Sequence, residues 1–335
     1  MKVVQYQSPG GLNNLKVVEI SDPGEPTANE VRVRLHASSL NGHDYNVATG
    51  VLPVQDRRII LTDGAGIVEA VGKDVSEFAP GEQVISTFFP DWLSGDAPSD
   101  TFARTPGDGL DGYAAEVVIR PEQWFTHAPL GWSLREAATL PTAGVTAWRA
   151  VVVEGELRSG QYVLILGTGG VSMFAVQFAK QIGAKVIVIS SSDEKLEKVR
   201  SLGVDFGVNY NRDTKWSTKI REFTAGRGVD LTIETVGPGT LPQSIEATRI
   251  GGRIVLIGVL TGVAGVVPTV AIMNRQQRIQ GITVGSRSQQ IEMVASLNRM
   301  ALRPVIHAHY PLAKISEAFR LHESGAHVGK ICLDF

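Results

Sequence analysis

Hydrophobic and polar positions follow two different patterns along the chain. Up to about residue 125, short segments such as Val31–Ala37 alternate apolar and polar side chains, and turns rich in glycine and proline separate them. A period of two is typical of a strand with one buried face. We therefore expect an antiparallel, barrel-like β domain here, and no segment of this part predicts a helix of convincing length.

Strands and helices alternate from about residue 144 to residue 287. The apolar runs of this part are mostly continuous, as expected for parallel strands that are buried on both faces. They cover residues 163–166, 185–189, 206–210, 229–234 and 253–258. The order of elements predicts an α/β protein with a doubly wound Rossmann sheet. We expect residues 144–287 to form this nucleotide-binding domain, and residues 1–143 and 288–335 to form the β-rich domain.

The first strand of this sheet leads directly into a glycine turn. Gly167-Thr168-Gly169-Gly170-Val171-Ser172 follows the apolar run, and an amphipathic helix and a second strand come after it. Gly167 permits a tight turn, Gly169 leaves room for a pyrophosphate, and the start of the helix offers unpaired N–H groups to an anion. Because a strand precedes the turn and a helix follows it, the motif predicts dinucleotide binding.

The second strand of the sheet ends on serine, where NAD-binding chains of this layout usually carry an acid. Ser190 and Ser191 stand at this place. An acid there would bond the ribose 2′-hydroxyl, whereas serine leaves space and hydrogen bonds for a 2′-phosphate. The sequence therefore predicts NADP(H) as the cofactor.

Composition narrows the class of partner. The 335 residues include 32 basic and 34 acidic side chains, which gives no electrostatic reason to expect nucleic acid or an anionic membrane as a partner. The single cysteine, Cys332, excludes an internal disulfide and fits a reducing compartment. Residues 1–6 form no apolar signal segment, and no run approaches membrane-spanning length. We expect a cytoplasmic protein that binds small molecules.

Residues 86–112 form an irregular stretch that is too long for an ordinary connection. It carries several aromatic side chains, including Phe88, Phe89 and Trp92, among prolines and glycines. Two interpretations remain open: a surface loop that its aromatic side chains hold down, or a lid over a substrate cleft.

Six motifs occur in a fixed order along the chain. They are Leu40–Asp44, Asp63–Gly72, Leu140–Trp148, the glycine turn, Gly251–Arg253 and Gly285–Arg287. Through them the chain resembles the medium-chain dehydrogenase/reductase superfamily, and specifically its zinc-free branch near quinone oxidoreductases and zinc-independent alcohol dehydrogenase-like proteins. The resemblance implies a GroES-like catalytic domain, a nucleotide domain inserted into it, an active site between the two, and a homodimer formed through the nucleotide domains.

The resemblance also identifies the positions where zinc-dependent members carry the three ligands of the catalytic metal. Asn41, Thr62 and Thr142 stand at these positions, and Asp63 keeps an acidic neighbour. Amide and hydroxyl oxygens are poor zinc ligands compared with thiolate and imidazole. We therefore expect chemistry without zinc and no metal site.

Three catalytic candidates follow from the resemblance. Asn41 and Thr62 are placed to donate hydrogen bonds to a carbonyl oxygen that gains negative charge. The alternative for each is a local hydrogen bond that serves the fold. His43 matches the position of a proton relay, which makes it a candidate acid. The alternative for His43 is a partly buried histidine bonded to Asp44.

Further residues are expected at the cofactor. Thr146 lies near the start of the nucleotide domain, and Gly258 ends a core strand where the backbone can meet the cofactor. Lys195 and Tyr210 resemble the pair that embraces the 2′-phosphate in NADPH-dependent quinone reductases. Ser286 and Arg287 are expected, by the same resemblance, to reach the cofactor from the last segment.

These observations lead to one principal hypothesis and two alternatives. The principal hypothesis is a zinc-independent, NADP(H)-dependent oxidoreductase that reduces an activated double bond or a quinone by hydride transfer. The first alternative is a zinc-free alcohol dehydrogenase or carbonyl reductase. The second is a nucleotide-binding protein without catalysis.

Overall fold

The structure is a computed structural model that describes residues 1–99 and 101–335, with the backbone alone for residues 101 and 102. The described chain forms two compact units, residues 1–145 with 285–335 and residues 146–284. The sequence placed these boundaries at 143/144 and 287/288. As a result, Ser286 and Arg287 belong to the first unit.

The second unit contains a six-stranded parallel sheet in the order β10-β9-β8-β11-β12-β13. The chain starts at β8 in the middle and winds outward in both directions, so the strand order reverses between β8 and β11. This arrangement confirms the doubly wound sheet. The strands are β8 (Tyr162–Leu166), β9 (Lys185–Ser190), β10 (Phe206–Asn209), β11 (Val229–Glu234), β12 (Thr248–Leu256) and β13 (Arg278–Gly281).

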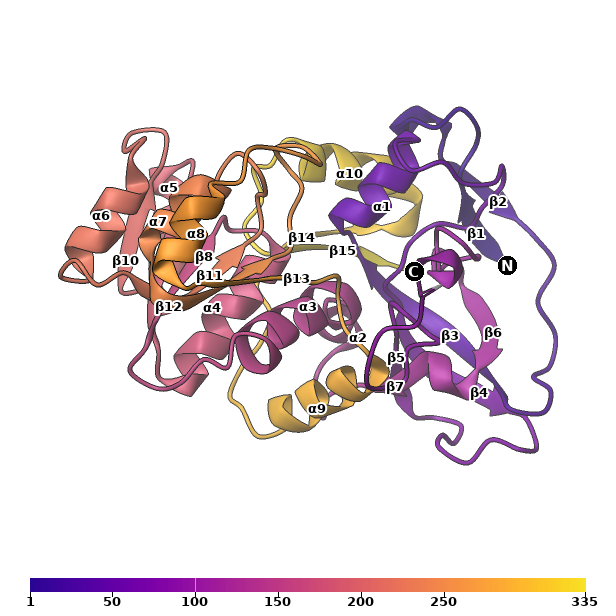
Figure 1. Cartoon of the computed structure of the whole chain (residues 1–335). Coiled ribbons are helices and arrows are strands. Elements are labelled where there is room, and N and C mark those ends of the chain that lie inside the picture. Colours follow the sequence, from indigo (N-terminus) through magenta and orange to yellow (C-terminus); the bar gives the residue numbers. More distant parts are fainter. Residues whose placement is uncertain (100) are drawn as a thin grey trace. The chain divides into compact units, whose positions relative to one another are not determined.

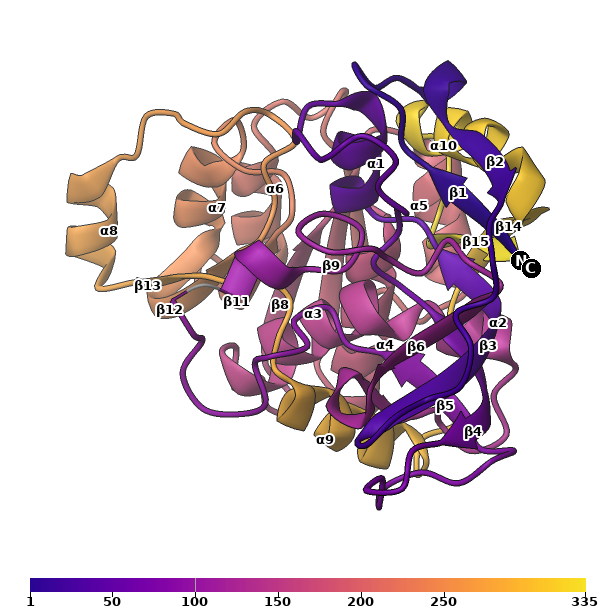
Figure 2. The same ribbon diagram turned by 90° about the vertical axis from the view of Figure 1, so that its right-hand side faces the viewer.

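Helices connect these strands. Figures 1 and 2 show α4 on one side of the sheet and α7 and α8 on the other. The apolar face of α4, which includes Phe174 and Phe178, is buried, and Gly183 ends the helix in the left-handed conformation. The helices are α3 (Val145–Trp148), which crosses the unit boundary, α4 (Gly170–Ile182), α5 (Asp193–Arg200), α6 (Trp216–Phe223), α7 (Leu241–Ala247) and α8 (Thr269–Arg275).

The first unit is β-rich, as the sequence predicts. A seven-stranded sheet runs in the order β14-β15-β3-β4-β5-β7, with β6 also paired to β3. Strand β15 comes from the end of the chain and pairs antiparallel with β3, with Cys332 opposite Ser39. The strands are β3 (Glu30–Ser39), β4 (Ala65–Val71), β5 (Gln83–Ser86), β6 (Val117–Pro121), β7 (Phe125–His127), β14 (Ile306–Pro311) and β15 (Lys330–Asp334); β1 (Lys2–Gln5) and β2 (Lys16–Glu19) form a separate pair.

One helix lies where the sequence predicts none of convincing length. Helix α1 covers Gly42–Thr49, and its apolar side chains do not form the stripe along one face by which a sequence predicts a helix. It is held at its start by a reciprocal capping arrangement between Asn41 and Asp44, and Gly50 ends it in the left-handed conformation. The remaining helices of this unit are α2 (Leu134–Ala137), α9 (Arg287–Leu297) and α10 (Ile315–Glu323).

The described part of the aromatic stretch 86–112 is anchored within the first unit. Phe88, Phe89 and Trp92 are each at most 4% exposed, and the indole nitrogen of Trp92 donates to the carbonyl of Gly95. The first backbone N–H of α9, from Arg287, donates to the Trp92 carbonyl. These contacts agree with the interpretation of a loop held down by its aromatic side chains.

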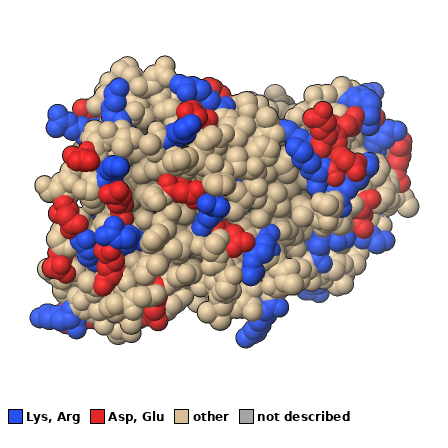
Figure 3. All heavy atoms as spheres, turned by 180° about the vertical axis from the view of Figure 1, so that it is seen from behind, with Lys and Arg blue, Asp and Glu red and all other residues tan. Residues whose placement is uncertain are grey.

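On the face drawn in Figure 3, basic and acidic side chains are interspersed rather than gathered by sign. No helix among the described residues is long and apolar enough to cross a membrane.

Gly258 follows β12 at a point where two chain segments come very close. A Cβ atom at Gly258 would lie 1.7 Å from the carbonyl oxygen of Thr235, which is far inside contact distance. The backbone N–H of Gly258 also bonds the Glu234 carbonyl. This packing accounts for the glycine without any ligand.

We expect Gly258→Ala to lower the free energy of unfolding by about 1–3 kcal/mol, because the added methyl group forces the two segments apart. Gly281→Ala is the matched control, since a Cβ atom there meets nothing within 4 Å. Urea unfolding of both variants measures the difference. Equal stability of the two variants would contradict the packing argument.

Candidate functional site

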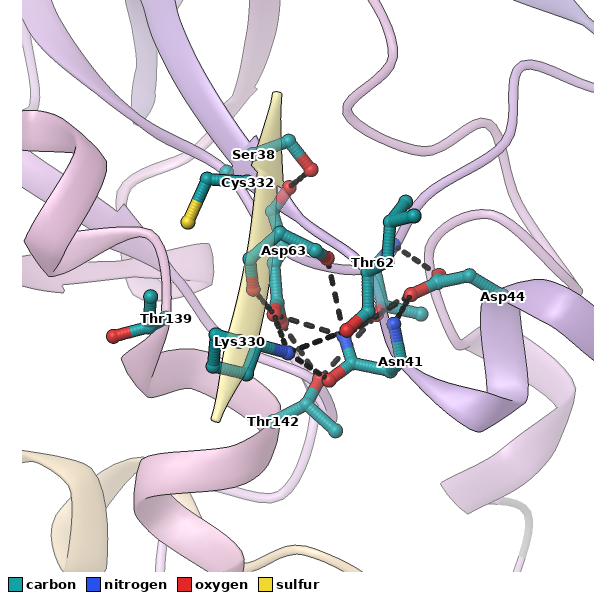
Figure 4. A network of polar contacts seen from close by, with 12 residues as sticks. Ser38, Asn41, Asp44, Thr62, Asp63, Thr139, Thr142, Lys330 and Cys332 are labelled. Atoms are coloured by element: carbon teal, nitrogen blue, oxygen red, sulfur yellow. Dashed lines mark hydrogen bonds and ion pairs between the residues drawn. The ribbon is translucent and has the colours of Figure 1, made fainter. Parts of the chain in front are cut away.

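Polar side chains from distant parts of the sequence meet inside the first unit (Figure 4). Asn41 caps the start of α1, and Thr62 and Asp63 precede β4. Thr142 lies in a helical turn at 140–144, and Lys330 is the first residue of β15. We call these five residues together with Asp44 the polar network.

Asp63 is at the centre of the polar network and is fully buried. Its Oδ1 atom accepts a hydrogen bond from the Thr142 hydroxyl at 2.6 Å. Its Oδ2 atom accepts from the Ser39 hydroxyl at 2.6 Å and from the Asn41 side-chain amide at 2.8 Å. A buried carboxylate needs such donors, because each replaces a lost contact with water.

Asp44 is a second buried carboxyl group in the polar network. It accepts from the backbone N–H groups of Asn41 and Thr62, both at 2.9 Å, and from the Asn41 amide at 3.0 Å. Burial and the neighbouring charge of Asp63 raise the pKa of Asp44 to about 6. The protein therefore holds two acidic groups within one small volume.

Lys330 supplies the positive charge beside these carboxyl groups. Its side chain is 3% exposed, and its ammonium group donates to the Leu40 carbonyl at 2.6 Å and to Asn41 Oδ1 at 2.5 Å. Its Nζ atom lies 3.7 Å from Asp63 Oδ2. Burial lowers the pKa of Lys330, and the negative charge of Asp63 opposes this shift. Lys330 is not among the residues that the sequence predicts for the site, because no local motif marks it.

The hydrogen atoms of Asn41 and Thr62 are directed into the polar network. The Asn41 amide donates to Asp63 and Asp44, and its oxygen accepts from Lys330. The Thr62 hydroxyl lies 3.1 Å from Asp44 Oδ1 and 3.3 Å from the Thr142 hydroxyl. These bonds are the local hydrogen bonds expected if Asn41 and Thr62 serve the fold. Donation to a substrate oxygen stays a prediction.

His43 lies on α1 with its ring in a partly buried position. Its Nε2 atom is buried without a hydrogen bond and is 3.6 Å from the Asp108 carboxylate. The ring packs edge-to-face on Phe88, with 5.4 Å between ring centroids. The acidic residue nearest to Nε2 is therefore Asp108, which belongs to the aromatic stretch. The alternative interpretation from the sequence named Asp44 instead. The role of His43 as an acid stays a prediction.

The polar network contains no thiolate or imidazole for zinc, and its two carboxylates are already bonded by other members of the network. At the positions of the three expected ligands it offers an amide and two hydroxyl groups, and these are already bonded to carboxylates or to Lys330. Zinc in proteins is held mainly by thiolate, imidazole and carboxylate. Among the described residues, no group of three or more His, Cys, Asp and Glu side chains is arranged to hold a metal ion.

The glycine turn of the second unit has the geometry expected of an anion site. Gly167 has a φ of +75° and makes the turn after β8. Gly169 precedes α4 and no side chain caps the start of this helix. A Cβ atom at Gly169 would meet nothing within 4 Å, so no packing contact requires glycine there. The unpaired N–H groups of the helix and this open space together fit a pyrophosphate.

The residues expected to contact the 2′-phosphate follow or end strands β9 and β10 at their carboxyl ends. Ser190 ends β9 and is 3% exposed, and its carbonyl accepts from the backbone N–H of Tyr210 at 3.0 Å. Ser191 follows, and Lys195 lies in the first turn of α5. Burial, with a smaller contribution from Lys198, lowers the pKa of Lys195. The structure thus places Ser190 and Tyr210 side by side, and a contact of these residues and Lys195 with the cofactor stays a prediction.

The remaining predicted cofactor residues have other partners in the structure. Thr146 is buried in α3. Ser286 caps the start of α9 by accepting from the backbone N–H of Gln289. Arg287 donates to the Phe125 carbonyl and forms an ion pair with Glu77. The hydrogen bonds of Ser286 and Arg287 therefore serve the first unit, and a contact of either residue with the cofactor stays a prediction.

Comparison with known proteins identifies relatives of the whole chain. Residues 27–130 match the alcohol dehydrogenase GroES-like domain, and residues 170–299 match the zinc-binding dehydrogenase family. A zinc-type alcohol dehydrogenase-like protein of Schizosaccharomyces pombe is 38% identical, over 99% of each chain.

Solved structures agree with this match over their full length. A crystal structure described as a putative alcohol dehydrogenase from Sinorhizobium meliloti has a TM-score of 0.93 and is 38% identical, covering 100% of this chain and 99% of that one. One described as an NAD-dependent alcohol dehydrogenase has a TM-score of 0.90 and is 33% identical, covering 100% of both chains. The chain therefore belongs to the medium-chain dehydrogenase/reductase superfamily and is an oxidoreductase of that family.

Proposed function

We propose that this protein is a zinc-independent, NADP(H)-dependent oxidoreductase that reduces an activated double bond or a quinone by hydride transfer. The observation that carries this proposal is the polar network. By the resemblance, its amide and its two hydroxyl groups occupy the positions of the zinc ligands of zinc-dependent members, and the Lys330 ammonium group bonds the amide. A reduction in which hydride adds to an electron-poor carbon does not require a Lewis acid, provided that hydrogen-bond donors stabilise the developing negative charge.

The second unit supports the cofactor part of the proposal. The start of α4 offers unpaired N–H groups to the pyrophosphate, and Gly169 leaves the space for it. Ser190, Lys195 and Tyr210 are the residues that would hold the 2′-phosphate. When bound, the reduced nicotinamide supplies the hydride, and His43 is our candidate for returning a proton to the product.

The names of the relatives favour the alternative substrate class. Both the Schizosaccharomyces pombe protein and the two solved structures are described as alcohol dehydrogenases or as similar to them. A zinc-free alcohol dehydrogenase or carbonyl reductase is therefore the second candidate. One relative is described as NAD-dependent, so cofactor preference needs its own test.

The substrate class is tested with the purified full-length protein after dialysis against EDTA. We expect consumption of NADPH with quinones or enones, followed by absorbance at 340 nm, and a slower reaction with aldehydes and ketones. Turnover of carbonyl substrates alone would favour the second candidate. No consumption with any of these substrates would favour a nucleotide-binding protein without catalysis.

His43→Ala is the diagnostic variant in this assay. Loss of the proposed acid should lower turnover by about 10²-fold and leave the KM for NADPH nearly unchanged. The control is His36→Ala, because His36 is exposed on β3. Full turnover of His43→Ala would leave His43 with a structural role.

Cofactor preference is tested at Ser190. A charge-assisted contact to the 2′-phosphate is worth about 1.5–3 kcal/mol, so the unmodified protein should prefer NADPH over NADH by about tenfold to hundredfold. Ser190→Asp should reverse the order, because its carboxylate repels the phosphate and bonds a free ribose hydroxyl. Ser201→Asp, at the exposed end of α5, is the control. Titration of both cofactors measures the result, and equal binding of NADH and NADPH by the unmodified protein would contradict this assignment.

We also propose a homodimer formed through the second unit. Strand β13 ends the order of the parallel sheet, so one of its edges has no partner strand among the described residues. The preceding segment exposes several large apolar side chains, among them Leu260 at 79%, Val263 at 93% and Val266 at 84%. An unpaired strand edge and exposed apolar side chains in the same unit fit pairing with a second copy.

Sedimentation at micromolar concentration tests the dimer. We expect the unmodified protein to sediment as a dimer and Leu260→Glu to shift it toward monomer, because the new charge would have to be buried in the interface. Leu130→Glu is the matched control, since Leu130 is also 79% exposed but belongs to the first unit. A monomeric unmodified protein would contradict the proposal.

A further inference from the structure

Lys330 is unusual among the basic residues of this protein. Within the described residues, it is the only lysine or arginine whose side chain is buried. Placing an ammonium group away from water is costly unless opposite charge and hydrogen bonds compensate for the lost hydration. Packing alone therefore does not explain why a lysine occupies this buried position.

The surroundings of Lys330 form a cation site made of oxygen atoms. Its Nζ atom contacts the carbonyl oxygen of Leu40 and the amide oxygen of Asn41, and it faces a carboxylate oxygen of Asp63. Asp44 adds a second buried carboxyl group nearby. Hard oxygen donors and buried negative charge are what a bound cation requires, and the protein supplies this cation from its own chain.

The ammonium group also decides how the Asn41 amide is oriented. Because Asn41 Oδ1 accepts from Lys330, its NH2 group must point to the opposite side, where it donates to Asp63 and Asp44. Asp63 in turn accepts from the Thr142 hydroxyl. The orientation of the polar network thus depends on a positive charge at this point.

We propose that Lys330 is a positioning residue that serves as the resident cation of this site, in place of a bound metal ion. It fixes the Asn41 amide and the Asp63 carboxylate, and through them Thr62 and Thr142. The kinetic part of this inference rests on the proposed zinc-independent activity. The part that concerns charge compensation does not, and it is measured separately.

The first experiment measures charge compensation by thermal unfolding of the full-length protein. Lys330→Met should lower the unfolding temperature by roughly 5–10 °C, because it leaves a buried carboxylate without a counter-charge. In a protein that already carries Asp63→Asn, the same change should cost clearly less. Lys16→Met is the matched control, because Lys16 is exposed on β2. The unfolding temperature of the unmodified protein should not respond to EDTA or to zinc chloride.

The second experiment separates charge from packing by chemical rescue. Lys330→Ala leaves a cavity, and n-propylammonium chloride should raise both its unfolding temperature and its turnover of NADPH. The neutral 1-propanol, which has the same size, should not do so, and tetramethylammonium chloride controls for ionic strength. Before rescue, we expect kcat to fall by roughly tenfold to hundredfold with the KM for NADPH unchanged, as is typical of lost positioning.

Several results would overturn the proposal. They are a Lys330→Met protein as stable as the unmodified one, equal rescue by 1-propanol and n-propylammonium, and a tightly held metal in the unmodified protein whose removal lowers its unfolding temperature. If the unmodified protein consumes no NADPH with any substrate, the proposed function fails, whereas the two unfolding measurements still decide the role of Lys330.

Discussion

The first unit depends on the burial of an ammonium group against two buried carboxyl groups. Neither charge is tolerable alone in this interior, because water is excluded and no solvent screens it. Lys330 comes from the last strand, whereas Asp63 and Asp44 lie near the start of the chain. Their attraction therefore joins the C-terminal strand to the N-terminal half of the sheet, in addition to the backbone pairing of β15 with β3.

The same interaction constrains the possible chemistry. Asn41, Thr62 and Thr142 each have at least one hydrogen-bond partner inside the protein. A metal ion would have to displace the ammonium group and break these bonds. For this reason we propose a reaction that relies on the cofactor and on hydrogen-bond donors, with Lys330 as the positive charge of the site.

In the second unit, the charge proposed to bind a ligand is left without a partner among the described residues. This charge is the partial positive charge at the start of α4, which is left without a side-chain cap and with open space beside Gly169. Strand β9 ends on Ser190, so the chain carries no carboxylate at this position. A network whose groups bond one another in one unit and an uncapped helix start in the other are what we expect of a pre-organised site and a phosphate-binding surface, respectively.

The sequence alone determined the parallel sheet and the glycine turn, whereas a site without zinc stays a prediction that rests on the resemblance. The sheet and the turn are local features, because continuous apolar runs and a strand–glycine–helix order can be read directly. Helix α1 escaped prediction because capping by Asn41 and Asp44, not an apolar stripe, defines it. The place of Lys330 and the neighbour of His43 were decided only by tertiary structure. Leu40 is 290 residues from Lys330 in sequence, and only the pairing of β15 with β3 brings the two together.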